Sequence, residues 1–254
     1  MCAGCRTSMI PEHVPPDREP AAAYANLLER VVTEDGLVDY DALEADREPL
    51  DRYVAWLAGD PMRGRQSMDR HAFWLNAYNA LVLYQVLERG RPDSVLDVNG
   101  WIPAEGAGFF YETQFKIEQD WLSLSEIENE RIRWMELDLR DHSALNCASR
   151  SCPPLRAELY RPAQLDRQLK EQMRRWMEDD ERGVRIEAGV AVFNPIFDWY
   201  ARDFEFFSVG KDICEVAAFH VGKEKAAALL ELHEQGCPHR FSEYDWRLND
   251  ASAE

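Results

Sequence analysis

The sequence predicts an α+β fold, in which a single helix-rich domain packs on a small, mainly antiparallel sheet. Apolar residues recur at helical spacing over several long stretches, and short alternating stretches bounded by turn signals lie between them. No internal repeat or linker divides the chain. With 254 residues, of which 46% are hydrophobic, it is long enough to bury a large core.

The first helices follow a short N-terminal arm. Residues 1–19 are expected to form a flexible arm, and residues 20–250 the single domain. Apolar spacing predicts helices over Ala21–Val32 and Tyr40–Leu57. Asp35-Gly36 supplies a turn signal between them.

The most apolar segment of the chain is Ala72–Leu87. It carries no charged residue, so we expect a helix that is buried on most sides and that ends at Arg89–Pro92. Phe109–Ile117 alternates well enough to predict a strand. Ser123–Glu126 is a capping box, which opens a helix that runs to about Met135.

The second half of the chain mixes helices and strands in the same way. Pro162–Met177 is predicted as an amphipathic helix, and Val184–Phe193, with Gly189 in the middle, as a β-hairpin. Ile213–Leu232 is predicted as a further helix.

Charge and hydropathy exclude two classes of function. The chain has 47 acidic and 29 basic residues, a net charge of −18, whereas binding to nucleic acid needs a basic surface. No apolar stretch approaches the ~20 residues of a membrane helix, which predicts a soluble protein. The expected partner is therefore an unknown small molecule or protein. Only five basic residues are lysines, which indicates either a halophilic source or a genome rich in arginine codons.

The N-terminus gives two expectations about the compartment. It contains no apolar signal-peptide region, so we expect a cytoplasmic protein with reduced thiols. Ala3-Gly4-Cys5, however, matches the end of a bacterial lipoprotein cleavage site. An envelope lipoprotein anchored through Cys5 is the alternative if the true start lies upstream.

Thiol and imidazole side chains gather in one segment, Asp138–Arg156. His142, Cys147 and Cys152 lie within eleven positions there, before a double proline. These side chains are often recruited for nucleophilic chemistry or metal binding, so this segment is the candidate site. If residues 143–147 form a strand, a direct pair of His142 and Cys147 requires that the strand end at Cys147.

Four interpretations of the segment stay open. Either cysteine acts as a nucleophile with His142 as its base, in a hydrolase or acyl transferase. Alternatively, Cys147 and Cys152 form a dithiol–disulfide pair, because the spacing allows the ~4.4–6.8 Å that a disulfide needs between Cα atoms. A zinc site of the three residues lacks a fourth ligand. In the last interpretation the cysteines are buried hydrophobes of a non-catalytic interaction domain. We assign no metal and no cofactor.

The position of Cys152 before Pro153 gives it a second route to reactivity. Proline is favoured at the first helical position, so this thiol is expected at a helix start. The partial positive charge of that helix end, with Arg150 nearby, would lower the pKa of Cys152.

Three further polar residues complete the catalytic candidates. Asn76 and Asn79 lie on one face of an otherwise apolar helix, so their buried carboxamides need hydrogen-bond partners. They either assist His142 and line an oxyanion site or bind the backbone of a crossing loop, and we favour the backbone role. Glu128 either orients His142 or pairs with Arg131 or Arg133, and we favour the ion pair.

One more group near the C-terminus has loose metal-ligand spacing. His233, Cys237 and His239 lie close together, but we interpret them as a solvated loop after the preceding helix. Gly236 is the expected C-cap of that helix.

Taken together, six blocks resemble the family called domain of unknown function 547, in family order and over most of residues 24–250. The blocks are Leu37–Tyr40, Ala72–Ala80, Ser123–Glu128, Asp138–Arg156, Phe197–Phe204 and Tyr244–Asn249. The resemblance implies no established activity. Related domains fused to glutaredoxin-like modules imply thiol chemistry, and those fused to coiled-coil zippers imply partner binding.

The chain departs from the family pattern in two places. Asn129 stands where a histidine is frequent, which argues against a metal or acid–base role at this position. Asp141 and Ser143 flank His142 where apolar residues are usual, so we expect His142 to be less buried here.

Overall fold

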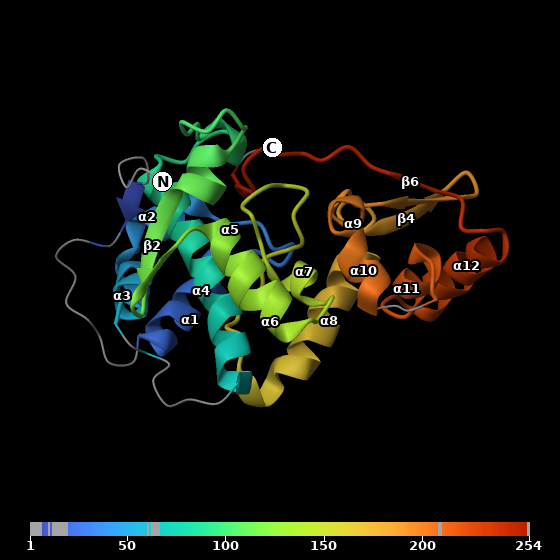
Figure 1. The fold of residues 1–254 in the computed structure, drawn as a ribbon, viewed down its shortest axis with the longest axis horizontal. Coiled ribbons are helices and arrows are strands. Elements are labelled where there is room, and N and C mark those ends of the chain that lie inside the picture. The colour runs from blue at the N-terminus through green and yellow to red at the C-terminus, as the bar shows by residue number, and fades with distance from the viewer. Residues whose placement is uncertain are drawn as a thin grey trace.

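Helices form most of the regular structure and follow one another along the long axis of the molecule (Figure 1). The structure is a computed structural model that describes residues 7–9, 11, 20–59, 61, 67–207 and 210–252. The described residues combine twelve α-helices with two three-stranded sheets, which confirms the predicted α+β class. None of these helices has both the length and the hydrophobicity needed to span a membrane.

Each sheet contains one antiparallel and one parallel pair of strands. The strands, in sheet order, are β1 (Thr7–Met9), β2 (Thr113–Ile117) and β3 (Asp120–Leu122), then β4 (Val184–Glu187), β5 (Val190–Phe193) and β6 (His239–Phe241). β2–β3 and β4–β5 are local antiparallel hairpins, of which the second was predicted. β1 and β6 join in parallel from distant parts of the chain. Local pattern reveals hairpins, but it does not reveal such distant partners.

Part of the predicted N-terminal arm belongs to the first sheet. Thr7–Met9 pairs with β2, with Ser8 opposite Gln114. Apart from this strand and Pro11, residues 1–19 lie outside the described residues, and so does Cys5.

The N-terminal helices surround the long apolar helix. They are α1 (Ala21–Val31), α2 (Tyr40–Ala45), α3 (Glu48–Leu57) and α4 (Ser67–Glu88). The continuous helix predicted over Tyr40–Leu57 is wrong, because it is divided into α2 and α3. Pro49 explains the break, since its ring would clash with the carbonyl of Ala45, where α2 ends. α4 is buried from Ala72 to Leu87, as predicted.

The middle of the chain consists of short helical segments. They are η1 (Val95–Asp97), η2 (Gly108–Glu112), α5 (Leu124–Glu126), η3 (Ile127–Arg133), α6 (Trp134–Glu136) and α7 (Asp141–Ala144). The predicted capping box of Ser123 and Glu126 is present. The strand predicted over Phe109–Ile117 begins only at Thr113, because η2 buries Phe109 in a helical turn instead.

The last third of the chain contains the remaining helices. They are η4 (Pro162–Gln164), α8 (Leu165–Glu178), α9 (Ile196–Trp199), α10 (Ala201–Phe207), α11 (Ile213–Ala218) and α12 (Lys223–Glu234). The single helix predicted over Ile213–Leu232 is wrong, since α11 ends before Gly222, which takes an extended conformation and starts α12. Gly236 has a positive φ after α12, as expected for a C-cap residue.

Two hydrophobic clusters are joined by α8. Leu165 and Leu169 belong to the first cluster, which includes most of α1–α4, whereas Met173 and Trp176 belong to the second, with β4, β5 and α9–α12. Figure 1 shows that the chain then runs back from β6 to the first cluster, so that the C-terminal segment lies across both. This return places residues 244–250 beside the cysteine segment.

Candidate functional site

The cysteine segment is held in place on one side by Asn79 of α4. The Asn79 carboxamide donates to the carbonyl of Ala144, at 2.9 Å, and accepts from the amide of Asn146, at 3.0 Å. The segment therefore leaves α7 in a fixed direction at Leu145, and the strand considered for residues 143–147 is wrong.

The C-terminal segment holds the other side. The amide of Arg150 donates to the carbonyl of Arg247, and Asn249 donates to Ala148, at 2.9 and 3.0 Å. The Ser151 hydroxyl accepts from the amide of Asp245 at 2.8 Å. The side chain of Asn79 and the C-terminal segment thus hold the backbone around the two cysteines from two sides.

Cys147 and Cys152 face each other within this frame. Their Sγ atoms are 2.8 Å apart, and the amide of Cys147 donates to Cys152 Sγ at 2.9 Å. Cys147 is partly exposed, whereas Cys152 is only 3% exposed. Cys147 Sγ also contacts the hydroxyls of Ser149 and Tyr244, at 3.1 and 3.3 Å.

These contacts separate the pKa values of the two thiols. Burial alone would raise the pKa of Cys147, but hydrogen bonds with Cys152, Ser149 and Tyr244 outweigh it and lower this pKa to about 7. Burial and the neighbouring Cys147 raise the pKa of Cys152 well above its usual value. The pair therefore combines an accessible thiol that ionises easily with a buried thiol that keeps its proton.

The predicted helix start at Cys152 is wrong. Residues 153–161 contain no helix, and the next helical turn begins at Pro162. Successive prolines at 153 and 154 keep this stretch extended, since the residue before a proline avoids helical angles. The thiol with the lowered pKa is Cys147, and hydrogen bonds rather than a helix end lower it.

His142 lies on α7 and is bound by an aspartate. Its Nε2 is 2.9 Å from Asp203 Oδ2, and its ring packs against Tyr200 and Phe204. Asp203 also pairs with Arg133, and the hydrogen bonds from His142 and Arg133, together with the guanidinium charge, hold the pKa of this carboxyl well below its usual range despite partial burial. Neither thiol is a hydrogen-bond partner of His142 among these contacts.

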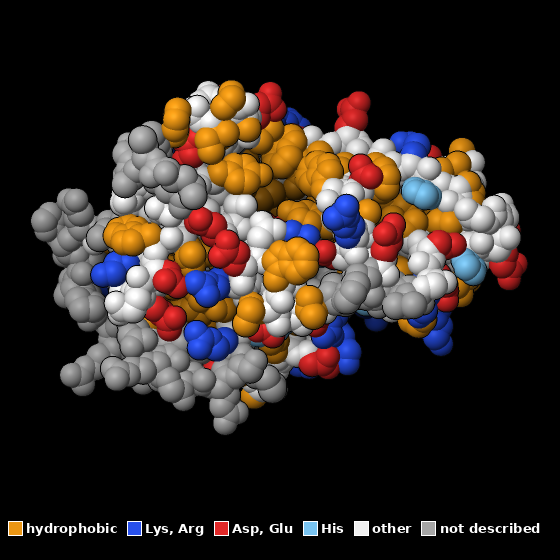
Figure 2. All heavy atoms as spheres, in the orientation of Figure 1, with side chains coloured by type: hydrophobic (Ala, Val, Ile, Leu, Met, Phe, Trp, Pro, Cys, Tyr) orange, Lys and Arg blue, Asp and Glu red, His pale blue; other side chains and the backbone are white. Residues whose placement is uncertain are grey.

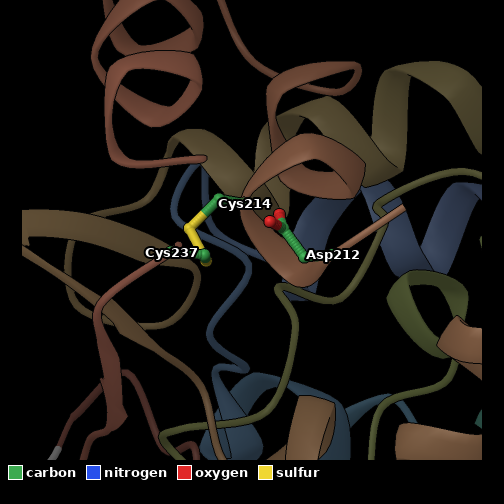
Figure 3. A group of neighbouring side chains, drawn as sticks. All are labelled: Asp212, Cys214 and Cys237. Atoms are coloured by element: carbon green, nitrogen blue, oxygen red, sulfur yellow. A yellow bond between two sulfur atoms is a disulfide. The ribbon is translucent and has the colours of Figure 1, made fainter. Parts of the chain in front are cut away.

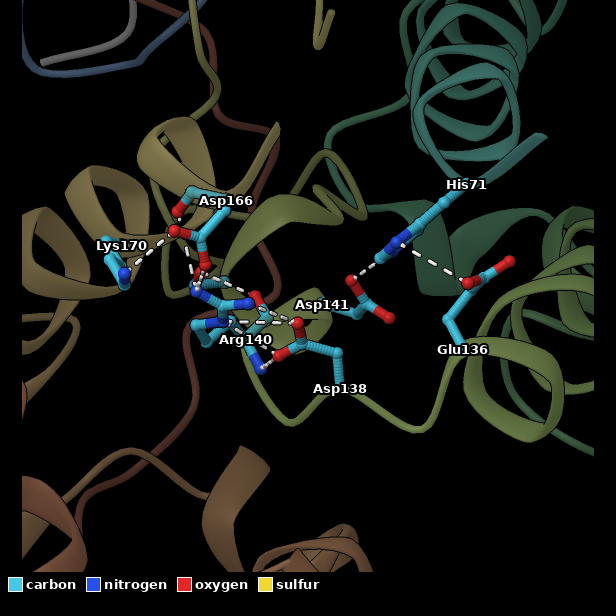
Figure 4. A network of polar contacts seen from close by, with 8 residues as sticks. His71, Glu136, Asp138, Arg140, Asp141, Asp166 and Lys170 are labelled. Atoms are coloured by element: carbon cyan, nitrogen blue, oxygen red, sulfur yellow. Dashed lines mark hydrogen bonds and ion pairs between the residues drawn. The ribbon is translucent and has the colours of Figure 1, made fainter. Parts of the chain in front are cut away.

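The expectation that His142 would be less buried is wrong, since it is 6% exposed. Asp141 beside it is also buried, because its Oδ1 is 2.7 Å from Nε2 of His71 on α4. Figure 4 shows this pair, with Glu136 on the far side of the imidazole, and the adjoining chain of ion pairs from Asp138 to Lys170. The polar neighbours of His142 thus anchor α7 instead of exposing it.

The other candidates take different partners. The Asn76 carboxamide donates to and accepts from the backbone of Tyr160, each at 2.8 Å. Both asparagines of α4 therefore bind the backbone of crossing segments, as we favoured. The ion pair favoured for Glu128 is wrong, because Glu128 accepts from the Tyr200 hydroxyl at 2.6 Å. Arg131 and Arg133 pair with Asp120 and Asp203 instead.

Four of the six candidate residues line one cavity of about 610 Å³. They are Glu128, His142, Cys147 and Cys152. Figure 2 shows a hollow lined mainly by hydrophobic side chains where Figure 1 places α9 and the cysteine segment. Cavities of this size accommodate small molecules, so Cys147 is placed to meet one. Asn79 does not line this cavity but binds the backbone of Ala144, which precedes the two cysteines, and Asn76 lines a different cavity.

One group of side chains elsewhere has the spacing of metal ligands, but two of its members form a disulfide and so offer no thiolate to a metal. Within the described ranges, the group with ligand atoms within 4.8 Å of one another consists of Asp212, Cys214 and Cys237 (Figure 3). Cys214 and Cys237 form a disulfide, so our expectation that the thiols are reduced is wrong for this pair. Their Cα atoms are 5.8 Å apart, well within the range for a disulfide. The segment after α12 is exposed at Gln235, Gly236 and His239, as expected, but Cys237 itself is buried.

Sequence reasoning assigned no role at the site to Asp203, Ser149 or Tyr244. Asp203 binds His142, while Tyr244 contacts both Cys147 and Ser149. Asp203 and Tyr244 are distant in sequence from the cysteines, and only their membership of the blocks Phe197–Phe204 and Tyr244–Asn249 could have indicated a shared site.

Comparison with known proteins gives one match. Residues 63–177 match the family model described as "Protein of unknown function, DUF547". No curated protein and no solved structure matches the chain. The matched range includes Cys147, Cys152 and His142, but ends before Asp203 and Tyr244.

Proposed function

Since this chain carries the domain of the DUF547 family, whose function is unknown, we propose a function from the site itself: thiol–disulfide exchange on a small molecule in the cavity. Cys147 is the attacking thiol, and Cys152 is the resolving thiol. The observation that carries the proposal is the 2.8 Å contact between the sulfur atoms of two cysteines that both line the cavity.

The sulfur positions suit a reversible bond. A disulfide needs about 2.05 Å between sulfur atoms, so a small side-chain movement converts the observed contact into a bond. Asn79 and the C-terminal segment hold the surrounding backbone, which lets the pair close without a rearrangement of the chain.

The exchange proceeds in two displacements. The Cys147 thiolate attacks one sulfur of the substrate disulfide, forms a mixed disulfide and releases the other sulfur as a thiolate. Cys152 then gives its proton to the released thiolate and attacks Cys147 Sγ, which frees the second half of the substrate. The substrate is reduced by two electrons, the cysteine pair is oxidised to a disulfide, and an external dithiol of the cell reduces the pair again.

The experiment uses the full chain, reduced gently so that Cys214–Cys237 stays intact, and hydroxyethyl disulfide as substrate. We expect the wild type to form the Cys147–Cys152 disulfide, which peptide mass spectrometry detects. In Cys152→Ser the mixed disulfide should accumulate on Cys147, and in Cys147→Ser neither product should form. The proposal fails if the wild type forms no bond between the two residues, or if the mixed disulfide gathers on Cys152.

A second candidate, cysteine-dependent acyl transfer or hydrolysis, is favoured by a separate observation. His142 lines the same cavity as Cys147, and Asp203 orients it in the manner of the third member of a triad. Catalytic hydrogen bonds are often longer before substrate binds, so the missing contact with Cys147 leaves this candidate open. Turnover of p-nitrophenyl acetate that survives Cys152→Ser but is lost in both Cys147→Ser and His142→Gln would favour it over exchange.

A further inference from the structure

The described residues that line the cavity include two carboxylates and one imidazole, that of His142. The carboxylates belong to Glu105 and Glu128, and none of the described lining residues is a lysine or arginine. Glu105 is exposed at the rim, whereas Glu128 is partly buried and binds the hydroxyl of Tyr200. An anionic group entering the cavity would therefore meet two carboxylates.

The nearby arginines offset this charge only in part, and Arg133 is the one whose charge acts on Glu128. Arg133 lies over the ring of Tyr200 and is bound by Asp203. Arg247 pairs with Asp245 outside the cavity. Each guanidinium has a carboxylate partner besides the glutamates of the cavity, so Glu105 and Glu128 leave an excess of negative charge at the opening.

Three of the aromatic side chains that line the cavity form one cluster. Tyr244 and Trp246 have ring centroids 4.4 Å apart, and Trp199 lies 4.8 and 5.5 Å from them. Trp199 is 48% exposed, which is high for a tryptophan that belongs to a packed cluster. Aromatic faces attract ammonium and guanidinium groups and favour apolar chains, but they offer nothing to a carboxylate.

Resting on the function proposed above, we infer that the substrate is a disulfide with a cationic arm, which the aromatic cluster and the two glutamates bind while Cys147 attacks its sulfur. Anionic disulfides are disfavoured at the same site. The net charge of −18 acts in the same direction at longer range, by attracting cations towards the opening.

The test compares three small disulfides with similar arms but different charges: cystamine is cationic, hydroxyethyl disulfide neutral and dithiodipropionate anionic. The rate of Cys147 modification is followed by peptide mass spectrometry at low salt. Each rate is divided by the rate of the same disulfide with a free-cysteine peptide, which removes differences in intrinsic reactivity. We expect the normalised rate of cystamine to exceed that of dithiodipropionate by roughly tenfold, and high salt to shrink the difference.

Single variants separate the cavity from the overall charge. Glu128→Gln keeps an acceptor for Tyr200, and Glu105→Gln changes an exposed side chain. Glu224→Gln, on the exposed start of α12, is the matched control, since it removes the same charge away from the cavity. Glu105→Gln and Glu128→Gln should each lower the cation-to-anion ratio more than Glu224→Gln does.

The outcomes are distinguishable. A ratio near or below one, with the Cys147–Cys152 bond still formed, overturns the inference and leaves the proposed exchange intact. An equal effect of all three variants also overturns it, because the preference would then come from overall charge. If none of the three disulfides produces the Cys147–Cys152 bond, the proposed function itself fails.

Discussion

The described part of the chain contains two pairs of neighbouring cysteines, one bonded and one free. Cys214 and Cys237, 23 positions apart, form a disulfide that ties α11 to the end of α12. Cys147 and Cys152 are much closer in sequence and in contact, yet they are free thiols. Proximity of two sulfur atoms therefore does not distinguish a structural pair from a candidate reactive one.

The surroundings of each pair make the distinction. Cys214 and Cys237 are buried in the second hydrophobic cluster, beside residues such as Leu229 and Leu232. Cys147 instead borders a cavity and contacts the hydroxyls of Ser149 and Tyr244. An apolar setting stabilises a permanent link, whereas polar contacts and access to solvent favour a thiolate that reacts.

Removing the disulfide is the change with the largest expected effect. In Cys214→Ala/Cys237→Ala the unfolded chain gains the freedom of a loop of about 23 residues, so the free energy of unfolding should fall by about 3 kcal/mol. Urea unfolding measures it. The matched double variant Cys147→Ala/Cys152→Ala breaks no covalent link and should lose clearly less. Equal losses in the two variants would contradict the distinction drawn between the pairs.

The pH dependence of alkylation tests the reactive pair alone. Because hydrogen bonds lower the pKa of Cys147 to about 7, its labelling by iodoacetamide should be half-maximal near pH 7, about 1.5 units below a free cysteine. The thiolate is lost below this pH and fully formed well above it. Tyr244→Phe removes one of the stabilising hydrogen bonds, so its midpoint should move upwards. A wild-type midpoint near 8.5, as for unfolded protein in urea, would remove the case for an activated thiol.

Local sequence pattern predicted the parts of the fold that depend on local forces. The buried α4, the capping box at Ser123 and the hairpin at Gly189 follow from residues close together in the chain. Pro49 and Gly222 are local signals of a helix break, but the helical spacing of apolar residues continues across both and therefore predicted uninterrupted helices. The parallel partners β1 and β6 could not be found, because nothing local specifies a distant strand.

The candidate site shows the same limit. The sequence predicted the segment that carries His142, Cys147 and Cys152, because these residues cluster within it. It could not show that Asp203 would bind the imidazole or that Tyr244 would reach the thiol, since tertiary contacts alone unite them. It also pointed to Cys152 as a second thiol with a lowered pKa, whereas burial reverses the direction of that shift.

The smallest expected effect concerns the backbone beside Cys147. Ala148 has φ of +62°, a left-handed conformation that costs a residue with a Cβ about 1–2 kcal/mol. Ala188, in the exposed β4–β5 turn, has φ of +51° and serves as the matched control in the other half of the molecule. Glycine relieves the strain at either position but makes the unfolded chain more flexible, so each variant should gain only about 0.5 kcal/mol.

The two glycine variants should differ in reactivity rather than in stability. Ala148→Gly makes the backbone between Cys147 and Ser149 more flexible, which weakens the contact between their side chains. The alkylation midpoint of Cys147 should therefore rise slightly. Ala188→Gly should leave this midpoint unchanged, because the β4–β5 turn lies outside the cavity. The midpoints come from the same iodoacetamide titration, and the stabilities from urea unfolding. If Ala148→Gly stabilises the fold and leaves the midpoint at its wild-type value, the strained backbone has no part in setting the pKa of Cys147, and the side-chain hydrogen bonds alone account for it.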